Sequence, residues 1–437
     1  MTAETWRNSH VSSNIRTARG LPRGRCQLPA CSARVPRMTD LLRRDWMISL
    51  AAGMGGALAG CAPRAATAAP PLRPAPPPAR PPGGVDQLIA TCRGALVTGA
   101  RIFDGAELVR IGQWCQQQHA VADRYGTGDL VETLEQRIAS LLGFEAACFM
   151  PTGTMGQLCL LRLYADRSRG RALGVHPSSH HLLHESAAFE VLHGMHEVVL
   201  SPWGRVLLGD DVRHAPEPLA VVSVELPARW TGQMQTWAEL EDLKTACRER
   251  GVPLHIDGAR LWEAAPAFGR PLAEVCRGCS SAYVSLYKTI GALGGAVVAG
   301  SKELIDGARL WRHRHGGNVA AYFPYAASAA MRIDDVLARI PKWVARAQRL
   351  AARLAKDARF IVAPEVPPTN LFHVYARIDA AEFPKRLEQV ARDHKIWVAH
   401  GAGRARVPGF LDIELQPGAD AETLTDDEAV AAMQALL

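Results

Sequence analysis

The chain has 437 residues, 48% of them hydrophobic and 21% charged, which suits a globular protein of two domains plus a tail. Its net charge of +7 does not indicate nucleic-acid binding, because residues 1–84 hold twelve arginines, no lysine and three acidic residues, and the rest of the chain sums to −2. No run of about 20 apolar residues occurs, so no membrane-spanning helix is predicted.

Residues 38–61 have the order of features of a bacterial export signal. Arg43 and Arg44 precede a mildly apolar stretch that is too short to span a membrane, and the segment ends in LAGC at Cys61. The arginine pair resembles a twin-arginine signal, and LAGC resembles a lipobox whose cysteine is lipidated. We therefore expect an exported protein, periplasmic or anchored to the membrane through Cys61. The alternative is a chance alanine- and glycine-rich segment, in which case the protein is cytoplasmic.

Two further segments flank this signal. Residues 62–84 are dense in proline and alanine, which suits a semi-rigid linker and not a core. Residues 1–37 resemble neither a signal nor a linker. We interpret them as a non-native or disordered extension, with Met38 as the true start.

Cysteine spacing in the body argues against a metal site. Cys276 and Cys279 form a C-x-x-C pair, but no second pair completes a zinc site. We expect both to be small buried residues near a helix end. A chain of this length needs no disulfide framework.

From about Val85 onward, short apolar runs alternate with amphipathic helices. The leucines, valine and isoleucine of residues 130–142 share one helical face, and Gly143 follows as a helix stop. Thr236 and Glu239 predict a capping box for a helix that runs to Arg250. Strands are expected at residues 146–150, 219–225, 253–256, 281–285 and 295–299.

This alternation indicates an α/β fold with a mostly parallel sheet and helices on both faces. We assign residues 85–321 to a large cofactor-binding domain and residues 322–437 to a small C-terminal α/β domain. The small domain is expected to contain a helix near residues 341–354, with Pro341 in its first turn, and strands at residues 371–375 and 396–399.

Three short segments fall at predicted strand ends, where this fold class binds ligands. Each has an ordinary explanation alone, as a turn, a solvated loop or a helix start. Together they meet the needs of pyridoxal phosphate: an amine from Lys288, an acid beside the pyridine nitrogen from Asp257, and a phosphate cradle at a helix N-terminus. The backbone N–H groups of Gly153, Thr154 and Met155 are expected to form that cradle. Arg260 lies three residues beyond Asp257 and can face the same pocket.

The same segments carry a resemblance to a known family. HIDGARLWEA (residues 255–264) and SLYKTIGALGG (residues 285–295) resemble the threonine aldolase and aromatic amino acid β-eliminating lyase family. MPTGTMGQL (residues 150–158) and the segment before it, residues 125–149, resemble the family's phosphate cup and its approach. The resemblance covers about residues 125–322 and continues more weakly to the C-terminus.

The resemblance implies the type I pyridoxal-phosphate fold and a homodimer or homotetramer with shared sites. It assigns covalent cofactor attachment to Lys288, the pyridine nitrogen to Asp257, and a cofactor or substrate contact to Arg260. In HPSSHHLLHE (residues 176–185) the ring-stacking histidine falls on His180, which could also transfer protons.

The sequence departs from the family at the substrate end of the site. Where threonine aldolases have E-N-T-H-N, this chain has E-L-P-A-R, so the family's histidine position falls on Ala228 and Arg229 follows. The pattern resembles a side branch of the family. Arg229 either binds a carboxylate or phosphate or is a structural ion-pair donor. The substrate-carboxylate arginine is not obvious, and Arg404 and Arg406 are the candidates.

We expect an amino acid lyase that cleaves β-hydroxy-α-amino acids to glycine and an aldehyde. The alternative is β-elimination or racemisation on the same cofactor, because Ala228 cannot take a proton from a β-hydroxyl. A more distant alternative is a lipoprotein that kept the cofactor fold and lost catalysis, against which the intact Lys288 and Asp257 argue. No metal is required by any of these readings.

Overall fold

The computed structural model describes residues 84–100 and 103–437, all of which belong to one compact unit, Pro74–Leu437. The expected extension and export signal, including Cys61, lie outside the described residues. Within the described part of the chain, no helix has both the length and the apolar character needed to cross a membrane.

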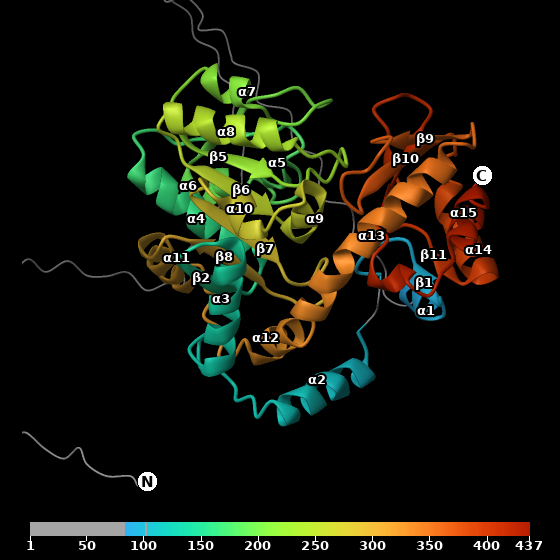
Figure 1. Ribbon diagram of the computed structural model, residues 1–437, viewed down its shortest axis with the longest axis horizontal. Helices are drawn as coiled ribbons and strands as arrows, with labels where there is room; N and C mark the ends of the chain where they lie inside the picture. The colour runs from blue at the N-terminus through green and yellow to red at the C-terminus, as the bar shows by residue number, and fades with distance from the viewer. Residues whose placement is uncertain (1–83, 101–102) are drawn as a thin grey trace, which may run out of the picture. The chain divides into compact units, whose positions relative to one another are not determined.

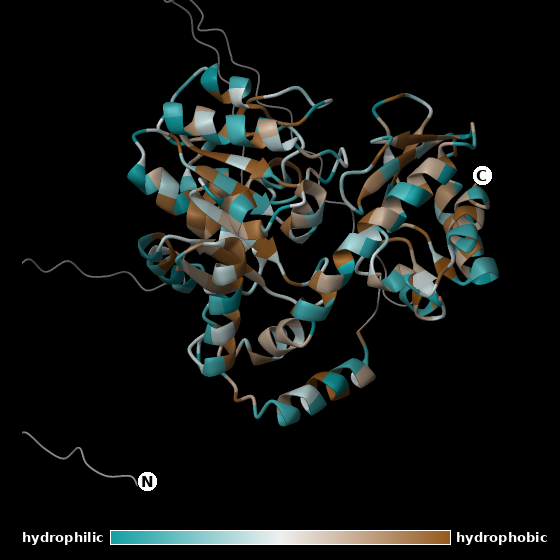
Figure 2. Ribbon diagram, viewed as in Figure 1, coloured by the Kyte–Doolittle hydropathy of each residue, from teal (hydrophilic) through white to brown (hydrophobic). Residues whose placement is uncertain are grey.

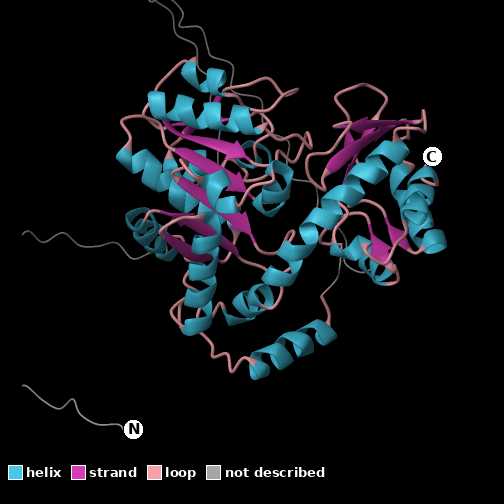
Figure 3. Cartoon of the chain, viewed as in Figure 1, coloured by secondary structure: helices cyan, strands magenta, loops and turns pink. Residues whose placement is uncertain are grey.

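A seven-stranded sheet forms the centre of the larger part (Figures 1 and 3). Its five strands from β7 to β4 run parallel, and only the pairings β2–β8 and β8–β7 are antiparallel. The predicted fold class, α/β with a mostly parallel sheet, is therefore confirmed. In order across the sheet the strands are β2 (Ala146–Met150), β8 (Ala296–Gly300), β7 (Ser281–Ser285), β6 (Leu254–Gly258), β5 (Leu219–Glu225), β3 (Ala172–Val175) and β4 (His196–Val199).

Helices cover both faces of this sheet, and each face has its own apolar core. One core includes Leu134 of α3, Leu240 of α8 and Val275 of α10. The other includes Leu161 of α4 and Phe189 of α6, together with residues of α11. In Figure 2 helix α8 carries mostly hydrophilic colour, as expected for a helix with one face in solvent. The helices of this part are α3 (Asp129–Leu142), α4 (Gly153–Arg167), α5 (His180–Leu183), α6 (Ala188–His193), α7 (Gly209–Arg213), α8 (Trp237–Glu249), η1 (Leu261–Glu263), α9 (Ala264–Phe268), α10 (Leu272–Cys276), α11 (Lys302–Arg314) and α12 (Phe323–Ala330).

Several local signals act as the sequence predicted. Gly143 ends α3 in a left-handed conformation with φ of 73°, which glycine adopts without strain. Thr236 and Glu239 form the expected capping box at the start of α8. Strands β2, β5 and β7 have the predicted bounds.

The smaller part contains a four-stranded antiparallel sheet and a two-stranded parallel pair. Helix α13 reaches from the first core into the second, since Ile340 packs in the first and Leu350 in the second. The elements of the smaller part are α13 (Ile333–Leu354), β9 (Phe360–Ala363), β10 (Phe372–Ala376), α14 (Phe383–His394), β11 (Ile396–Trp397), β12 (Gly403–Arg404), β13 (Leu411–Leu415), η2 (Ala419–Ala421) and α15 (Asp426–Gln434).

The prediction that Pro341 lies in the first turn of its helix is wrong. Helix α13 begins at Ile333 and passes through Pro341. Proline costs a helix interior about 3 kcal/mol, mainly through a lost N–H and a clash with the preceding turn. Here Val336, Ile340 and Trp343 bury one face of the helix on both sides of the proline, which offsets that cost.

The N-terminal residues of the body differ from the expectation that residues 85–321 form one domain. Strand β1 (Gly94–Ala95) pairs with β11, and Leu96 and Val97 belong to the core of the smaller part. Helix α1 (Gly84–Ala90) contacts α14, as Figure 1 shows for the blue and red segments, and α2 (Gly105–Gln117) follows. The apolar run at residues 95–97 packs against segments near the C-terminus. The periodicity of a sequence cannot indicate contacts between segments so far apart.

Candidate active site

Parallel strands bring three predicted segments to one edge of the sheet. Asp257 in β6 lies opposite Glu225 of β5 on one side and opposite Tyr283 of β7 on the other. A cavity of about 240 Å³ opens at this edge. It is lined by five of the predicted residues: Gly153, Thr154, His180, Asp257 and Lys288.

Lys288 lies in the loop after β7, and its backbone N–H donates to Ser285 Oγ at 3.3 Å. Burial lowers the pKa of its ammonium group to about 8, and the positive charge of Arg260 acts in the same direction. Asp257 and Glu225 act in the opposite direction and limit the shift. At pH 7, about a tenth of Lys288 side chains are therefore unprotonated and nucleophilic.

Asp257 terminates a chain of buried hydrogen bonds. Gln157 donates from Nε2 to Asp257 Oδ2 at 2.8 Å, and its Oε1 lies 2.9 Å from His255 Nε2. His255 Nδ1 contacts Ser281 Oγ at 2.8 Å, and Ser281 contacts Tyr164 Oη at 2.6 Å.

The direction of this chain can be assigned from its end. A carboxylate only accepts, so the Gln157 amide nitrogen points toward Asp257 and its oxygen must accept from His255. Burial lowers the pKa of His255 to about 3, so its ring is neutral and its Nδ1 accepts from Ser281. Every donor therefore points toward Asp257, which holds the carboxylate at a fixed position.

The start of helix α4 lies where the phosphate cradle is predicted. Helix α4 begins at Gly153, and a Cβ at this position would lie 2.2 Å from Tyr283 Oη, so only glycine lets the helix end approach this wall. The first N–H groups of a helix have no intrahelical partner, which leaves those of Gly153 and Thr154 for an anion. Met155 differs from the prediction, because its N–H donates to Thr152 Oγ1 at 3.2 Å and the residue does not line the cavity.

His180 starts α5 and lines the cavity. Its Nδ1 lies 3.3 Å from Glu185 Oε1, so Nε2 is the nitrogen that can act toward a bound molecule. Glu185 also contacts His181 Nδ1 at 3.1 Å. Although burial opposes it, the charge of His181 and the hydrogen bonds from His180 and His181 lower the pKa of Glu185 to about 2, so this carboxylate is ionised and orients both rings.

The two predicted arginines meet a common carboxylate. Arg229 Nε donates to Glu414 Oε2 at 2.7 Å, while Arg260 Nη2 lies 3.8 Å from Glu414 Oε1. Arg260 Nε also donates to Gln416 Oε1 at 2.8 Å. Of the two roles considered for Arg229, the structural ion pair is therefore formed, and neither arginine lines the 240 Å³ cavity.

The remaining substrate candidate that the structure describes, Arg406, does not line the cavity of Lys288. Arg406 packs on Trp203, with its guanidinium carbon 3.6 Å from the ring centroid, and lines a different cavity. Arg404 lies in β12, and its side chain is outside the described part of the structure. Ala228 is buried and offers no proton acceptor from its side chain.

Sequence reasoning missed two buried acids near this site. Burial, reinforced by Asp257, raises the pKa of Glu225 to about 7, and burial raises that of Glu263 to about 7. Glu263 accepts from Thr289 Oγ1 at 2.6 Å. It also missed Gln157 and Glu185, although a glutamine within the apolar run of α4 was a usable signal for a buried polar contact.

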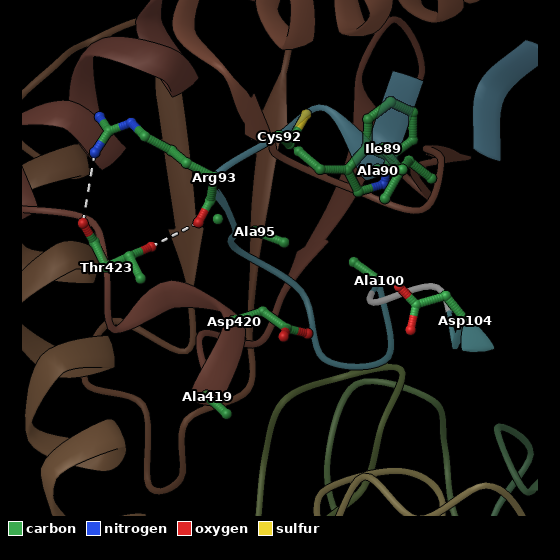
Figure 4. A pocket seen from close by; sticks show the side chains of 12 residues that line it. Ile89, Ala90, Cys92, Arg93, Ala95, Ala100, Asp104, Ala419, Asp420 and Thr423 are labelled. Atoms are coloured by element: carbon green, nitrogen blue, oxygen red, sulfur yellow. Dashed lines mark hydrogen bonds between the residues drawn. The ribbon is translucent and has the colours of Figure 1, made fainter. Parts of the chain in front are cut away.

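Two further cavities lie in this part of the molecule. One, of about 250 Å³, shares Tyr287 and Lys288 with the predicted site and extends to Arg332 and Arg339. The other, of about 330 Å³, is shown in Figure 4, where Thr423 Oγ1 donates to the Arg93 carbonyl at 2.8 Å. None of the predicted cofactor or substrate residues lines this last cavity.

Comparison with known proteins agrees with the geometry. The chain is 29% identical over 228 residues to a low specificity L-threonine aldolase of Escherichia coli O157:H7, covering 50% of this chain and 67% of that protein. A solved structure from Listeria monocytogenes EGD-E, assigned as an L-allo-threonine aldolase, is 29% identical with a TM-score of 0.73, covering 80% of this chain and 98% of that one. A serine palmitoyltransferase of Sphingomonas wittichii, at 16% identity and a TM-score of 0.58, shares the fold, and the match covers 78% of this chain and 85% of that one.

The family model for β-eliminating lyases matches residues 115–377, which is more than half of the chain. That range contains Gly153, His180, Asp257 and Lys288, the residues that line the cavity. The resemblance inferred from short motifs is thus confirmed over both the sheet and the start of the smaller part. The chain belongs to the β-eliminating lyase family.

Proposed function

We propose that this protein is a pyridoxal-phosphate-dependent carbon–carbon lyase that cleaves β-hydroxy-α-amino acids to glycine and an aldehyde. The observation that carries the proposal is the convergence of Lys288, Asp257 and Gly153 on one cavity in a chain of this family. The names of the E. coli and L. monocytogenes relatives support the aldolase reaction.

The residues around the cavity fit pyridoxal phosphate. Lys288 supplies a primary amine whose pKa is lowered to about 8. Asp257 supplies a buried carboxylate, fixed by Gln157, for a protonated ring nitrogen. The start of α4, kept close by Gly153, supplies N–H groups for a phosphate. When bound, the cofactor accepts the electrons released from the bond that breaks at the substrate's α-carbon.

The chain's own residues supply binding and proton transfer. Lys288 would hold the cofactor through its amine, and as an uncharged amine in the same cavity it would be a base near the substrate's α-carbon. Glu185 orients the imidazole of His180, whose Nε2 can take the proton of the β-hydroxyl, directly or through water. Asp257 would hold the pyridine nitrogen of the cofactor and favour its protonated form. Arg260 and Arg229, tied to Glu414, set a positive potential at the same edge of the sheet.

A second candidate is β-elimination or racemisation on the same cofactor. The observation that favours it is Ala228, which has no group to accept the β-hydroxyl proton. Incubation of the holoenzyme with L-threonine and L-serine separates the candidates. Acetaldehyde and glycine from threonine support the lyase, whereas pyruvate and ammonia from serine, or loss of optical rotation, would replace it.

Replacing Gly153 with alanine is expected to weaken cofactor binding about tenfold or more. The new Cβ would lie 2.2 Å from Tyr283 Oη, and this ring is buried, so the start of α4 must move. Overpacking of this kind costs roughly 1–3 kcal/mol. Equilibrium titration of apo-protein with pyridoxal phosphate measures the effect. Gly112→Ala in α2, where a Cβ meets nothing within 4 Å, is the matched control and should bind normally.

Capture of pyridoxal phosphate by the apo-protein is expected to accelerate as pH rises toward about 8. The nucleophile is the neutral amine of Lys288, whose pKa is lowered to about 8. Its neutral fraction falls about tenfold per pH unit well below that value. Stopped-flow absorbance of apo-protein mixed with cofactor gives the rate. A rate that is flat from about pH 6 to about pH 8 would contradict the lowered pKa.

We also propose that the protein works as a homodimer or homotetramer. The support is an exposed apolar surface around α2, where Leu108 and Val109 are 59% and 58% exposed. Tyr125 and Tyr287 are also exposed, and Tyr287 borders Lys288. Light scattering after gel filtration tests this directly, and a monomer at micromolar concentration would exclude it.

Residues 38–61 are proposed to export the protein, with Cys61 as the lipidation site. The support is the order of features in the sequence, since these residues lie outside the described structure. Fractionation of cells that express the full chain or Cys61→Ser tests the proposal. Membrane association that depends on Cys61 supports it, and cytoplasmic recovery of both proteins contradicts it.

A further inference from the structure

The loop that carries Lys288 is held by two consecutive residues of the short helix η1. Trp262 donates from Nε1 to the Ser285 carbonyl at 3.0 Å, three residues before Lys288. Thr289, directly after Lys288, donates from Oγ1 to Glu263 Oε1 at 2.6 Å. The side chains of Trp262 and Glu263 are buried, with the two residues 1% and 0% exposed. Helix η1 therefore fixes the loop on both sides of Lys288.

Glu263 has a second partner, which comes from the smaller part of the body. Gln416, the residue after β13, donates from Nε2 to Glu263 Oε1 at 3.2 Å. The orientation of this amide follows from its other partner, because an arginine only donates. Arg260 donates from Nε to Gln416 Oε1 at 2.8 Å, so the amide nitrogen faces Glu263. Glu263 is thus linked directly to the loop of Lys288 and, through Gln416, to Arg260.

Both hydrogen bonds of Glu263 fall on the same carboxyl oxygen. Oε1 accepts from Thr289 and Gln416, whereas Oε2 is buried and has no hydrogen-bond partner among the residues that the structure describes. Burial raises the pKa of Glu263 to about 7. Near neutral pH the group can therefore carry a proton on Oε2 and still accept both bonds on Oε1. The link persists in either protonation state, so it depends on the acceptor at Oε1 and not on the charge.

We propose that Glu263 is a positioning residue that places the Lys288 amine and the Arg260 guanidinium relative to each other. This inference rests on the proposed lyase function, for which the family resemblance assigns cofactor attachment to Lys288 and a cofactor or substrate contact to Arg260. Glu263 does not line the cavity of Lys288, so it acts through Thr289 and Gln416 and not by contact with a ligand. Displacement of a catalytic group by about 1 Å can lower a rate by roughly 10²-fold, which makes such a link effective.

Three substitutions separate the two arms of the link. Thr289→Val keeps the shape of the side chain but removes the donor, and it should slow capture of pyridoxal phosphate by the apo-protein about tenfold. Gln416→Leu releases Arg260 and should raise KM for L-threonine about tenfold, with a capture rate within about twofold of the wild type. Glu263→Leu removes the joint and should show both effects. Stopped-flow absorbance gives the capture rate, and aldehyde release at saturating cofactor gives KM.

Two conservative variants test whether the hydrogen bonds themselves are responsible. Thr289→Ser keeps the hydroxyl group and should capture the cofactor within about threefold of the wild-type rate. Glu263→Gln keeps an acceptor at Oε1 and should stay within about threefold in both readouts. Thr245→Val in α8 is the matched control, because Thr245 Oγ1 donates only to the Glu241 carbonyl of its own helix, at 2.9 Å. It should change neither readout.

Equal losses of capture rate in Thr289→Ser and Thr289→Val overturn the proposal, as do a normal capture rate and a normal KM in Glu263→Leu. Losses in Glu263→Gln as large as those in Glu263→Leu overturn it too, since the charge would then matter and not the acceptor. Capture is measured without substrate. A wild type that captures the cofactor and releases no aldehyde therefore overturns the lyase, while the capture rates of the Thr289 and Glu263 variants still decide whether Glu263 positions Lys288.

Discussion

Replacing Lys288 with alanine is expected to abolish covalent attachment of pyridoxal phosphate and to lower aldehyde release by about 10³-fold or more. No second primary amine lines the cavity, so none can take over the bond to the cofactor. The same substitution removes the base proposed to stand beside the α-carbon. Two functions are therefore lost together, which is why this change should have the largest effect on catalysis.

The measurement is the visible absorbance band of the bound cofactor, recorded before and after borohydride reduction, together with the rate of aldehyde release. Lys302→Ala is a suitable control, because Lys302 is exposed and pairs with Asp306 at 2.6 Å. It should keep both the band and the activity. A variant at Lys288 that still retains reduced cofactor covalently after denaturation would show that another lysine carries the attachment.

Replacing Asp257 with asparagine is expected to lower kcat by about 10²- to 10³-fold with a smaller change in KM. Asparagine has the same shape and can still accept from Gln157, so the buried hydrogen-bond chain survives. What is lost is the negative charge that keeps the cofactor nitrogen protonated and the ring able to accept electrons. The effect should therefore fall on the chemical step and not on folding.

Thermal unfolding and cofactor titration distinguish an effect of Asp257→Asn on the chemical step from an effect on folding. We expect a melting temperature close to that of the wild type. Asp257→Ala, in contrast, leaves the Gln157 amide buried without an acceptor and should cost a further 1–3 kcal/mol or so of stability. Asp242→Asn, at an exposed ion pair with Arg213, should alter neither kcat nor cofactor affinity. Wild-type kcat in Asp257→Asn would remove this residue from the proposed mechanism.

The sequence predicted the sheet well because its strands are short apolar runs bounded by clear stops. Strand β5, for example, is buried along almost its whole length, and its apolar run is interrupted only by Ser223 before it ends at Glu225. Pro341 shows the limit of such rules. The free-energy cost of a proline in a helix is outweighed when the turns on both sides of it pack into a core. The sequence pattern of that helix does not reveal such packing.

The sequence could place residues of the candidate site where a short motif lies at a strand end, but not contacts that depend on residues from distant segments. Asp257 lies at the end of the buried strand β6 and Lys288 follows the buried strand β7, so fold class alone brings them together. Gln157 reaches Asp257 from helix α4, and Arg229 after β5 meets Glu414 of β13, far along the chain. Met155 was placed in the cradle by its position in the motif, but the capping bond to Thr152 uses its N–H.

The parallel pairing of β1 with β11 has a consequence for synthesis of the protein. Gly94 leaves the ribosome early, whereas its partner Ile396 is made near the end of translation. Leu96 and Val97 must therefore remain without their native core until almost the whole chain is available. Contacts between distant segments slow folding, since the loop between them must close first. Early cleavage of the nascent chain, or a start codon placed downstream of Gly94, would leave the smaller part without one of its strands and with apolar surface exposed to aggregation.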